Sequence, residues 1–466
     1  MEEKEKEEAE DDLPEPTKPV AAKKAAKKEP AKKAGKKASK KAPAHLEFLR
    51  FDPRKEKKGD ILGLAKSYRE KNKDPKGPFR EGEMDTLDEL ELRRSFVMVP
   101  DLATMAALGR PGFCTRRIGH LLGFEGSGKT TYMYHLCRVF LEAGGYACMV
   151  ETEDAASALH MKSVVGREHY DEFQNCFYSI RSLVRGLQVV CDIIDQQFAV
   201  ADPKGRFPKI IVYDTIAGAS TEEIEALTSS DIGSQKGGIA TKARHVVRFL
   251  EYIKGRIHEQ NVLLIFGNQA KEKIATGNEA LFAGNKPKED KISGQGGKSV
   301  DYIATYWDYV QRGKTIVQGG RKIGFETHHR MKKNKMGLPK GGFTSIADFR
   351  RGVVYESSTM KQLAAVPSLG IQKIKGPKYW SDVLGIGSES SPLSEIEFYE
   401  AIHSPENIAQ AMAAVGGIVM PPHPERQVWM PKRWSSIPDF SGWDNDTLPS
   451  AGGKAMFTSE DIGIHD

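Results

Sequence analysis

The segment from Gly123 to Thr130 constrains the fold of this chain more than any other feature of its sequence. It reads GFEGSGKT, follows the apolar run RRIGHLLGF and precedes TTYMYHLCRVFLEAG, a helical pattern ended by glycines. The pattern GxxxxGK[ST] between a strand and a helix is that of a phosphate-binding loop. Its glycines let backbone N–H groups curl around phosphate oxygens, and the helix N-terminus adds the positive end of a dipole. The segment therefore predicts an α/β protein that binds a nucleoside triphosphate.

The chemistry of this loop assigns roles to its last residues. Lys129 is predicted to reach the β- and γ-phosphates, and the Thr130 hydroxyl is predicted to ligate Mg²⁺. Asp214 ends the apolar run KIIVYD, where a carboxylate can hold the same ion, although an aspartate at a strand end is also common. We therefore expect ATP and Mg²⁺ as cofactors. The predicted contacts are Gly123, Phe124, Glu125, Gly126, Ser127, Gly128, Lys129, Thr130, Thr131 and Asp214, with Thr130 and Asp214 as the metal ligands.

Three acidic residues follow the next apolar run, YACMV. They are Glu151, Glu153 and Asp154. The carboxyl ends of parallel strands are where α/β sheets bind their ligands. One of the three is therefore expected to orient the attacking water as a general base. The pattern of residues alone does not distinguish between them.

Apolar runs and helical patterns alternate from about residue 101, which predicts a mainly parallel sheet flanked by helices on both faces. The runs YACMVET, KIIVYDT and VLLIFGNQ are expected strands, and ATKARHVVRFLEYIKGRIHEQ is an expected helix. Shorter strands are expected after about residue 300. The predicted organisation is a tail at 1–44, a small helical and oligomerisation unit at 45–100, an ATPase core at 101–358 and a small α+β domain with a tail at 359–466.

The first 44 residues combine two charge blocks. Residues 1–17 hold nine acids and two lysines, and residues 18–44 hold eleven lysines and one glutamate. Their Lys, Ala, Gly and Pro composition predicts disorder, because it offers little apolar area to bury. The lysines suit phosphate contacts with nucleic acid through counterion release. The alternative is a tail that only improves solubility.

The remaining composition excludes several classes of protein. The mean hydropathy is -0.48, and no apolar run approaches the ~18 residues of a membrane helix. We therefore expect no membrane partner and no secretion, and a cytoplasmic protein associated with DNA or the nucleoid. The five scattered cysteines contain no CxxC pair, which argues against a disulfide framework and a structural zinc site.

Several further segments, in this order, resemble the RecA-type strand-exchange recombinases of bacteria and phages. The similarity covers roughly residues 95–358 and includes MVETEDA, IIVYDTIAG, IGSQKGGIATKAR, LLIFGNQ, SGQGGKSVDYIATYW and KKNKMGLPKGGFTSIADFRRGV. The resemblance implies a RecA-like ATPase fold, DNA-dependent ATP hydrolysis and a helical filament of identical subunits.

The resemblance also implies roles for single residues. It gives the catalytic glutamate role to Glu153 and places Thr215 after the Mg²⁺-binding Asp214. It makes Gln269 the sensor of the γ-phosphate. Lys333 and Lys335 match a KNK segment that reaches across a subunit boundary to the neighbour's ATP. The family usually places an aromatic residue near the adenine where this chain has His160.

Two DNA-binding loops are implied as well. The first includes Ser234, Gln235, Lys236 and Gly237. The second spans Ala270 to Gln295 and precedes the glycine pair Gly296 and Gly297. Its lysines suit phosphates and its one aromatic residue can wedge between bases, although that residue can equally form a local cluster with Leu281. The candidate DNA contacts of this second loop are Lys271, Lys273, Phe282, Lys286, Lys288, Gly296 and Gly297.

The function favoured at this point is an ATP-dependent recombinase that forms filaments on single-stranded DNA, searches duplex DNA and exchanges strands in recombination and repair. Mediator proteins are possible partners. One alternative is a hexameric helicase of the same fold, which uses an arginine finger and translocates. Another is a DNA-binding scaffold in which the lysine tail is the active part and the ATPase regulates assembly.

Overall fold

The computed structural model describes residues 86–221, 239–272, 292–294, 298–337 and 341–431, together with residues 67, 68, 70 and 71. The chain divides into two units, Met1–Phe79 and Arg80–Asp466. The tail predicted at 1–44 and most of the unit predicted at 45–100 lie outside the described residues. The predicted domain boundaries therefore stay predictions.

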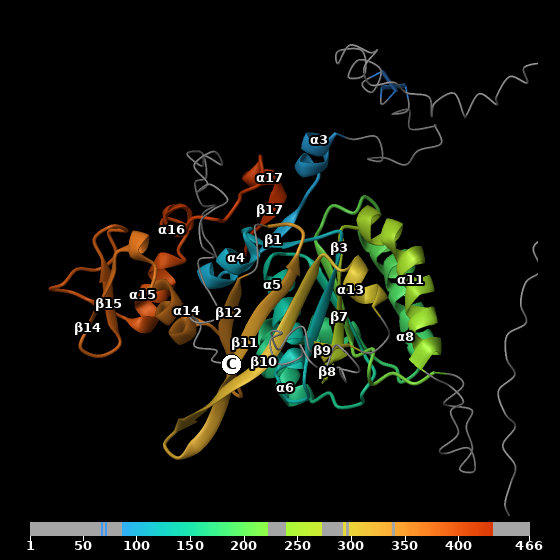
Figure 1. The fold of residues 1–466 in the computed structure, drawn as a ribbon, viewed down its shortest axis with the longest axis horizontal. Helices are drawn as coiled ribbons and strands as arrows, with labels where there is room; N and C mark the ends of the chain where they lie inside the picture. The colour runs from blue at the N-terminus through green and yellow to red at the C-terminus, as the bar shows by residue number, and fades with distance from the viewer. Residues whose placement is uncertain are drawn as a thin grey trace, which may run out of the picture. The chain divides into compact units, whose positions relative to one another are not determined.

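A nine-stranded sheet forms the centre of the second unit (Figure 1). Its middle is parallel from β10 through β3, β7, β6 and β4 to β5, and β11, β12 and β13 extend it as antiparallel strands. In spatial order the strands are β13 (Gly352–Val354), β12 (Gly342–Asp348), β11 (Arg321–Asn334), β10 (Tyr306–Gln318), β3 (Arg117–Gly123), β7 (Val262–Gln269), β6 (Lys209–Asp214), β4 (Tyr146–Glu151) and β5 (Phe177–Ser179).

The central strands are apolar because both of their faces are covered. All six residues of β6 are buried. Ile210 and Val212 pack into one hydrophobic core, while Ile211 and Tyr213 point to the other face and pack into a second. Alternate side chains of a strand point to opposite faces, so a strand buried on both sides needs a continuous apolar run. The predicted parallel sheet with two covered faces is confirmed.

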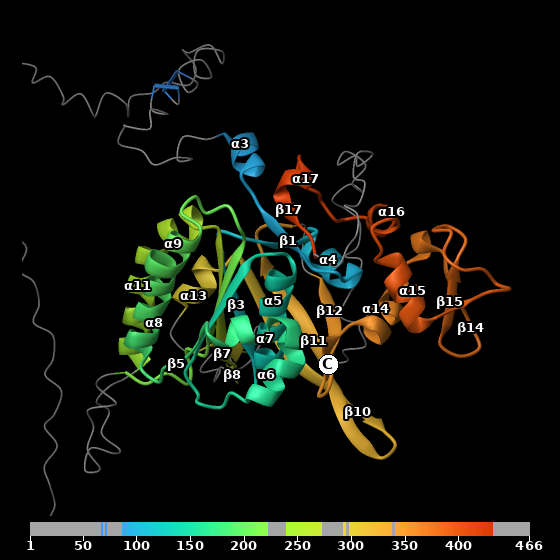
Figure 2. The same ribbon diagram turned by 180° about the vertical axis from the view of Figure 1, so that it is seen from behind.

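Helices cover the two faces of this sheet (Figure 2). On one face lie α5 (Lys129–Glu142), α6 (Ala158–Val165) and α7 (Arg167–Gln174), whose buried residues share a core with β6 and β7. The other face carries α8 (Leu183–Asp192), α11 (Ile239–Glu259) and α13 (Ser299–Ile303). A π-helical turn, η1 (Ile193–Phe198), and α9 (Ala199–Ala201) continue α8. The helices predicted after the phosphate loop and before VLLIFGNQ are confirmed as α5 and α11.

The expectation of shorter strands after residue 300 is wrong for β10 and β11, although the strands from β13 onward are short. β10 has 13 residues and β11 has 14, and together they form a hairpin that continues past the end of the neighbouring β3 (Figures 1 and 2). Its turn is formed by Gly319 and Gly320, both with positive φ, as a tight two-residue hairpin requires. The outer half of the hairpin is largely exposed, so it lacks the apolar run that marks a buried strand.

A second, three-stranded sheet joins distant parts of the chain. In it β1 (Phe96–Met98) lies between β2 (Gly112–Cys114) and β17 (Val428–Trp429). Two short helices, α3 (Leu87–Leu92) and α4 (Leu102–Leu108), flank β1 in the sequence.

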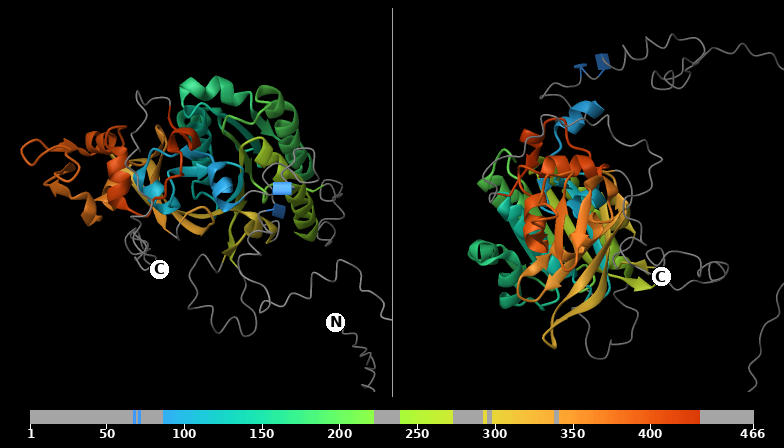
Figure 3. Two further views of the ribbon diagram at one scale, coloured as in Figure 1. Left: turned by 90° about the horizontal axis from the view of Figure 1, so that it is seen from above. Right: turned by 90° about the vertical axis from the view of Figure 1, so that its left-hand side faces the viewer.

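The C-terminal part forms a small α+β arrangement, as predicted. A sheet of β14 (Ile371–Ile374), β15 (Lys378–Ser381) and β16 (Leu393–Ser394) packs with helices near α4 (Figure 3). The helical elements are α14 (Glu356–Leu363), η5 (Pro367–Leu369), α15 (Glu395–Ile402), α16 (Ile408–Val415) and α17 (Pro424–Gln427). Across the described residues, no helix has both the length and the apolar character needed to cross a membrane.

Candidate active site

The phosphate loop connects β3 to α5 at the carboxyl edge of the sheet, and all three of its glycines are required by its geometry. Gly126 and Gly128 have φ of 69° and 94°, values that disfavour any side chain. A Cβ at Gly123 would lie 2.4 Å from the carbonyl oxygen of Val310 and 2.6 Å from the Ser127 hydroxyl. Gly128 is the N-cap residue of α5 and forms no side-chain hydrogen bond to the helix. The first backbone N–H groups of α5 therefore face the loop without a side-chain partner from the cap.

Lys129 is buried, and its ammonium group lies at the mouth of the loop. Its Nζ donates hydrogen bonds to the carbonyl oxygens of Gly123 (3.0 Å) and Phe124 (2.8 Å). Burial lowers the pKa of Lys129, while the carboxylates of Asp214, Glu153 and Glu125 act in the opposite direction. A cation held by loop carbonyls beside three acids is placed to meet a phosphate group.

Thr130 and Asp214 form a hydrogen-bonded pair beside Lys129. The Thr130 hydroxyl donates to Oδ2 of Asp214 over 2.6 Å, and Asp214 is 4% exposed at the end of β6. Burial raises the pKa of the Asp214 carboxyl to about 7, although the hydrogen bond from Thr130 lowers it. Within the described residues, its Oδ1 has no hydrogen-bond partner. Mg²⁺ prefers oxygen ligands, and the Thr130 hydroxyl and Oδ1 of Asp214 are two such oxygens side by side. This pair therefore fits a Mg²⁺ site.

The structure separates the three acids that follow β4. Oε1 of Glu151 accepts hydrogen bonds of 3.0 Å from the backbone N–H groups of Glu153 and Ala155, and its Oε2 accepts one from the Ser179 hydroxyl. Asp154 forms an exposed ion pair with Arg181. These contacts make Glu151 a buried support of the turn and leave Glu153 as the acid facing the site.

Glu153 is held from the end of β6. Its Oε1 accepts a hydrogen bond of 2.9 Å from the Thr215 hydroxyl, which in turn accepts one from the backbone N–H of Gly218. A Cβ at Gly218 would lie 2.5 Å from Cγ of Glu153, so this position has room only for glycine. Glu153 is thus held by the residue that directly follows Asp214. The sequence did not single out Gly218, because its requirement depends on a contact between two strand ends.

Gln269 ends β7 next to the phosphate loop. It pairs in register with Gly123, and the backbone N–H of Ala270 donates to the Gly123 carbonyl over 2.9 Å. Two residues earlier, a Cβ at Gly267 would lie 2.8 Å from Oδ1 of Asp214. The strand therefore passes close to both the phosphate loop and Asp214, and the sensing of a γ-phosphate by Gln269 stays a prediction.

His160 lies on α6 against the first turn of α5. Its Nε2 is 3.0 Å from the Thr131 hydroxyl, and its ring meets Tyr134 edge-on with a centroid separation of 5.9 Å. Burial lowers the pKa of His160, which favours the neutral ring. The structure thus brings His160 to the phosphate loop and its helix, and its contact with an adenine base stays a prediction.

Two residues of β11 border the loop, a third residue in the turn after β12 packs against one of them, and all three were missed from the sequence. Phe325 and Thr327 lie 3.1 and 3.2 Å from the position of a Cβ at Gly128. Phe349 is half exposed and meets Phe325 edge-on, with centroids 6.1 Å apart. No sequence signal links these residues to a loop some 200 positions earlier, since only the strand register brings them together.

Lys333 and Lys335 lie away from the phosphate loop of their own chain. The Lys333 Nζ donates to the carbonyl oxygens of Asp301 (2.5 Å) and Tyr302 (2.9 Å), and the Lys335 Nζ donates to the Tyr302 carbonyl over 3.4 Å. Lys333 pairs with Trp307 of β10, and Trp307 in turn pairs with His120 of β3. Because His120 lies three residues before Gly123 on β3, Lys333 is displaced from Gly123 by about 10 Å along the strand direction.

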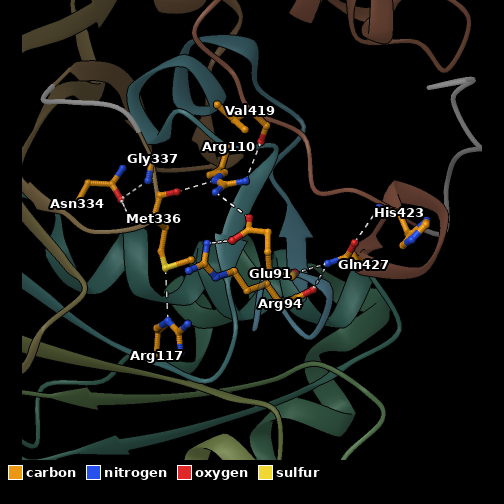
Figure 4. A network of polar contacts seen from close by, with 10 residues as sticks. All are labelled: Glu91, Arg94, Arg110, Arg117, Asn334, Met336, Gly337, Val419, His423 and Gln427. Atoms are coloured by element: carbon orange, nitrogen blue, oxygen red, sulfur yellow. Dashed lines mark hydrogen bonds and ion pairs between the residues drawn. The ribbon is translucent and has the colours of Figure 1, made fainter. Parts of the chain in front are cut away.

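The residue between these lysines is part of the fold (Figure 4). Oδ1 of Asn334 accepts from the backbone N–H groups of Met336 and Gly337. Its Nδ2 donates to the Leu108 carbonyl. Arg110 donates to the carbonyl oxygens of Met336 and Val419 and forms an ion pair with Glu91. The turn of the KNK segment is thus anchored from both sides, while its two lysines extend to α13.

Most predicted DNA contacts lie outside the described residues. These are Ser234, Gln235, Lys236, Gly237, Lys273, Phe282, Lys286, Lys288, Gly296 and Gly297. Lys271 is described. It is exposed on β8 (Lys271–Glu272), which pairs with β9 (Ile292–Ser293) directly after Gln269.

A second cation lies near Lys271. Lys242, on α11, donates to the Ala217 carbonyl over 3.1 Å. Burial and then the nearby Lys271 ammonium lower the pKa of Lys242. Lys242 of α11 and Lys271 of β8 therefore lie close together.

Comparison with known proteins agrees with this geometry. A family model described as the RecA N-terminal domain matches residues 79–349. Protein RecA of Mycoplasma pneumoniae is 26% identical over 293 residues, which is 61% of this chain and 76% of the relative. Protein RecA of Aquifex pyrophilus is 25% identical over 319 residues (68% and 81%), and that of Bacillus cereus is 28% identical over 255 residues (54% and 65%). This chain belongs to the RecA family, whose members bind ATP and DNA and act in recombination and repair.

Proposed function

We propose that this chain is a DNA-dependent ATPase that forms filaments on single-stranded DNA and catalyses homologous pairing and strand exchange. The observation that carries the proposal is the position of Gln269. It is paired with Gly123 of the phosphate loop on one side, and on the other it leads directly into the β8–β9 ladder and segment 273–291. A change at the phosphates can therefore be passed to a DNA-binding segment through one strand end.

Hydrolysis in this site would use Glu153 as the general base. Its carboxylate takes a proton from the attacking water, whose oxygen forms a bond to the γ-phosphorus as the bond to the β-phosphate oxygen breaks. Lys129 and the N–H groups of the loop balance the charge on the phosphates. Thr130 and Asp214 would hold Mg²⁺, which when bound supplies further charge neutralisation at the β- and γ-phosphates.

The two lysines of the KNK segment extend this proposal to the filament. Their ammonium groups lie on α13, at a different level of the sheet from the loop of the same chain. We propose that in the filament they contact the nucleotide of a neighbouring subunit. Hydrolysis would then depend on assembly, because a single subunit lacks part of its own site.

Electron microscopy with single-stranded DNA and a slowly hydrolysed ATP analogue tests the proposed function. An extended helical filament on the DNA supports it. Closed hexameric rings would favour a helicase, and amorphous condensates would favour a scaffold. A sample lacking nucleotide serves as the control, since filament formation is expected to require it.

A further inference from the structure

Arg312 lies beside the phosphate loop and has no role in the site described so far. It is on β10, two residues beyond Val310, which pairs with Gly123. Its Nη1 is 3.7 Å from the position that a Cβ at Gly126 would occupy, and among the described residues outside Glu125–Ser127 no other atom is within 4 Å of that position. The side chain is exposed. An exposed guanidinium group therefore lies beside Gly126 of the phosphate loop.

An aromatic ring holds this guanidinium in place. Its central carbon lies 4.2 Å from the centroid of the Phe325 ring, an arrangement typical of a cation–π contact. Phe325 is buried and packs against Gly128, and Thr327 pairs with Arg312 across the ladder. The phosphate loop, the ring and the guanidinium thus form one packed unit, which limits how far Arg312 can move from the loop.

The local charge leaves this guanidinium available for an anion. Among the described residues, no carboxylate forms an ion pair with Arg312, and the stretch from Tyr309 to Phe325 contains no Asp or Glu. A planar guanidinium can donate two parallel hydrogen bonds to a phosphate, and it stacks on aromatic rings while doing so.

We propose that Arg312 contacts the β- and γ-phosphates of the nucleotide bound in the loop of its own chain. This inference rests on the nucleotide-binding part of the proposed function and adds a cation to it. Lys129 lies at the end of the loop where α5 begins. Arg312 lies beside Gly126, on β10, which pairs with β3. Unlike Lys333 and Lys335, Arg312 needs no neighbouring subunit, so its contribution is present in the free protein.

Nucleotide affinity measured without DNA tests this inference. ADP, AMP and a slowly hydrolysed ATP analogue would compete with a fluorescent nucleotide for full-length wild-type, Arg312→Ala and Arg312→Lys proteins. Arg312→Ala is expected to lower the affinity for the ATP analogue and for ADP about tenfold, which is the size of one charge-assisted hydrogen bond at an exposed site. The affinity for AMP is expected to change less than about twofold. Arg312→Lys is expected to recover part of the loss, because it keeps the charge but not the planar fork.

Lys314→Ala is the matched control, since Lys314 is also exposed on the hairpin and, within the described part of the chain, forms no hydrogen bond or ion pair with the loop. It should bind all three nucleotides like the wild type. Unchanged ADP and ATP-analogue affinities in Arg312→Ala would overturn the inference, and so would an equal loss for AMP, which would mark a structural effect. Because no DNA is present, a failure of strand exchange leaves this result intact, and a failure here leaves the recombinase proposal intact.

Discussion

The Thr215 hydroxyl donates a hydrogen bond of 2.9 Å to Oε1 of Glu153, and this contact ties the proposed general base to the strand end that carries Asp214. The backbone N–H of Gly218 donates to the same hydroxyl, so this hydroxyl uses both its acceptor and its donor capacity in the turn. Glu151, two residues before Glu153, is instead occupied by two backbone N–H groups and a serine hydroxyl. The two glutamates of this turn thus differ in their contacts, and substituting each of them alone tests whether they also differ in function.

Glu153→Gln is expected to bind ATP normally and to lower DNA-stimulated hydrolysis by about 10²–10⁴-fold, because the amide cannot accept the proton of the attacking water. Steady-state phosphate release and nucleotide binding measure the two effects. Glu151→Gln is the matched control. It should retain hydrolysis per folded molecule and lose about 1–3 kcal/mol of unfolding free energy, since it weakens buried hydrogen bonds. A larger loss of turnover in Glu151→Gln than in Glu153→Gln would contradict the assignment.

Lys129→Ala is expected to reduce ATP hydrolysis by at least about 10²-fold while the protein stays folded, because the ammonium stabilises charge on the phosphates. Its present partners are two loop carbonyls, and the Gly123 carbonyl also accepts a hydrogen bond from the backbone N–H of Ala270, so the substitution removes two polar contacts and leaves the strand pairing in place. Phosphate release measures turnover, and thermal unfolding followed by circular dichroism checks the fold. Near wild-type turnover in a folded variant would exclude the assigned phosphate loop.

Lys333→Ala and Lys335→Ala are each expected to bind ATP and to lose DNA-stimulated hydrolysis by up to about 10³-fold, the effect of a cation at the γ-phosphate. Lys332→Ala is the matched control, because the Lys332 ammonium lies 4.4 Å over the Trp307 ring and belongs to no proposed site. It should hydrolyse ATP like the wild type.

A mixture of Lys335→Ala and Glu153→Gln proteins tests whether the site is shared. In a filament of equal parts, about one quarter of the head-to-tail interfaces combine an intact Glu153 with an intact Lys335, so hydrolysis should return to about that fraction. Labelled subunits establish that the filaments are mixed. If such mixed filaments stay inactive, the lysines act within their own subunit or not at all.

Deletion of residues 1–44 is expected to weaken DNA binding mainly at low salt. Each lysine engaged with single-stranded DNA contributes ~0.7 to the slope of log affinity against log salt, so three engaged lysines make the slope shallower by about 2. A variant in which the eleven lysines of residues 18–44 are replaced by glutamine keeps the length of the tail and should behave like the deletion. An unchanged slope in both proteins would contradict DNA binding by the tail and would support a role in solubility instead.

The parts of the site that could be predicted from the sequence are those set by short segments. The phosphate loop carries its own geometry in its glycines, and β6 and β7 are continuous apolar runs that end in Asp214 and Gln269. Resemblance to a known family selected Glu153 among three acids, and the hydrogen bonds of Glu151 give a physical reason for the same choice.

The parts that could not be predicted depend on the pairing of distant strands. Arg312 and Phe325 reach the loop because β10 pairs with β3 and then continues beyond it. Likewise, β17 lies beside β1 although more than 300 residues separate them. Such pairings are selected by the packing of the whole domain, and short exposed strands such as the outer half of β10 leave little apolar pattern to detect.

Strand exchange between circular single-stranded DNA and a homologous linear duplex tests the central claim most directly. The full-length protein is predicted to release a labelled displaced strand only when ATP and homology are both present, and to do so without residues 1–44. Displacement that is independent of homology would indicate a helicase and contradict the account. A protein that binds both DNAs and hydrolyses ATP, yet never forms joint molecules, would contradict it as well.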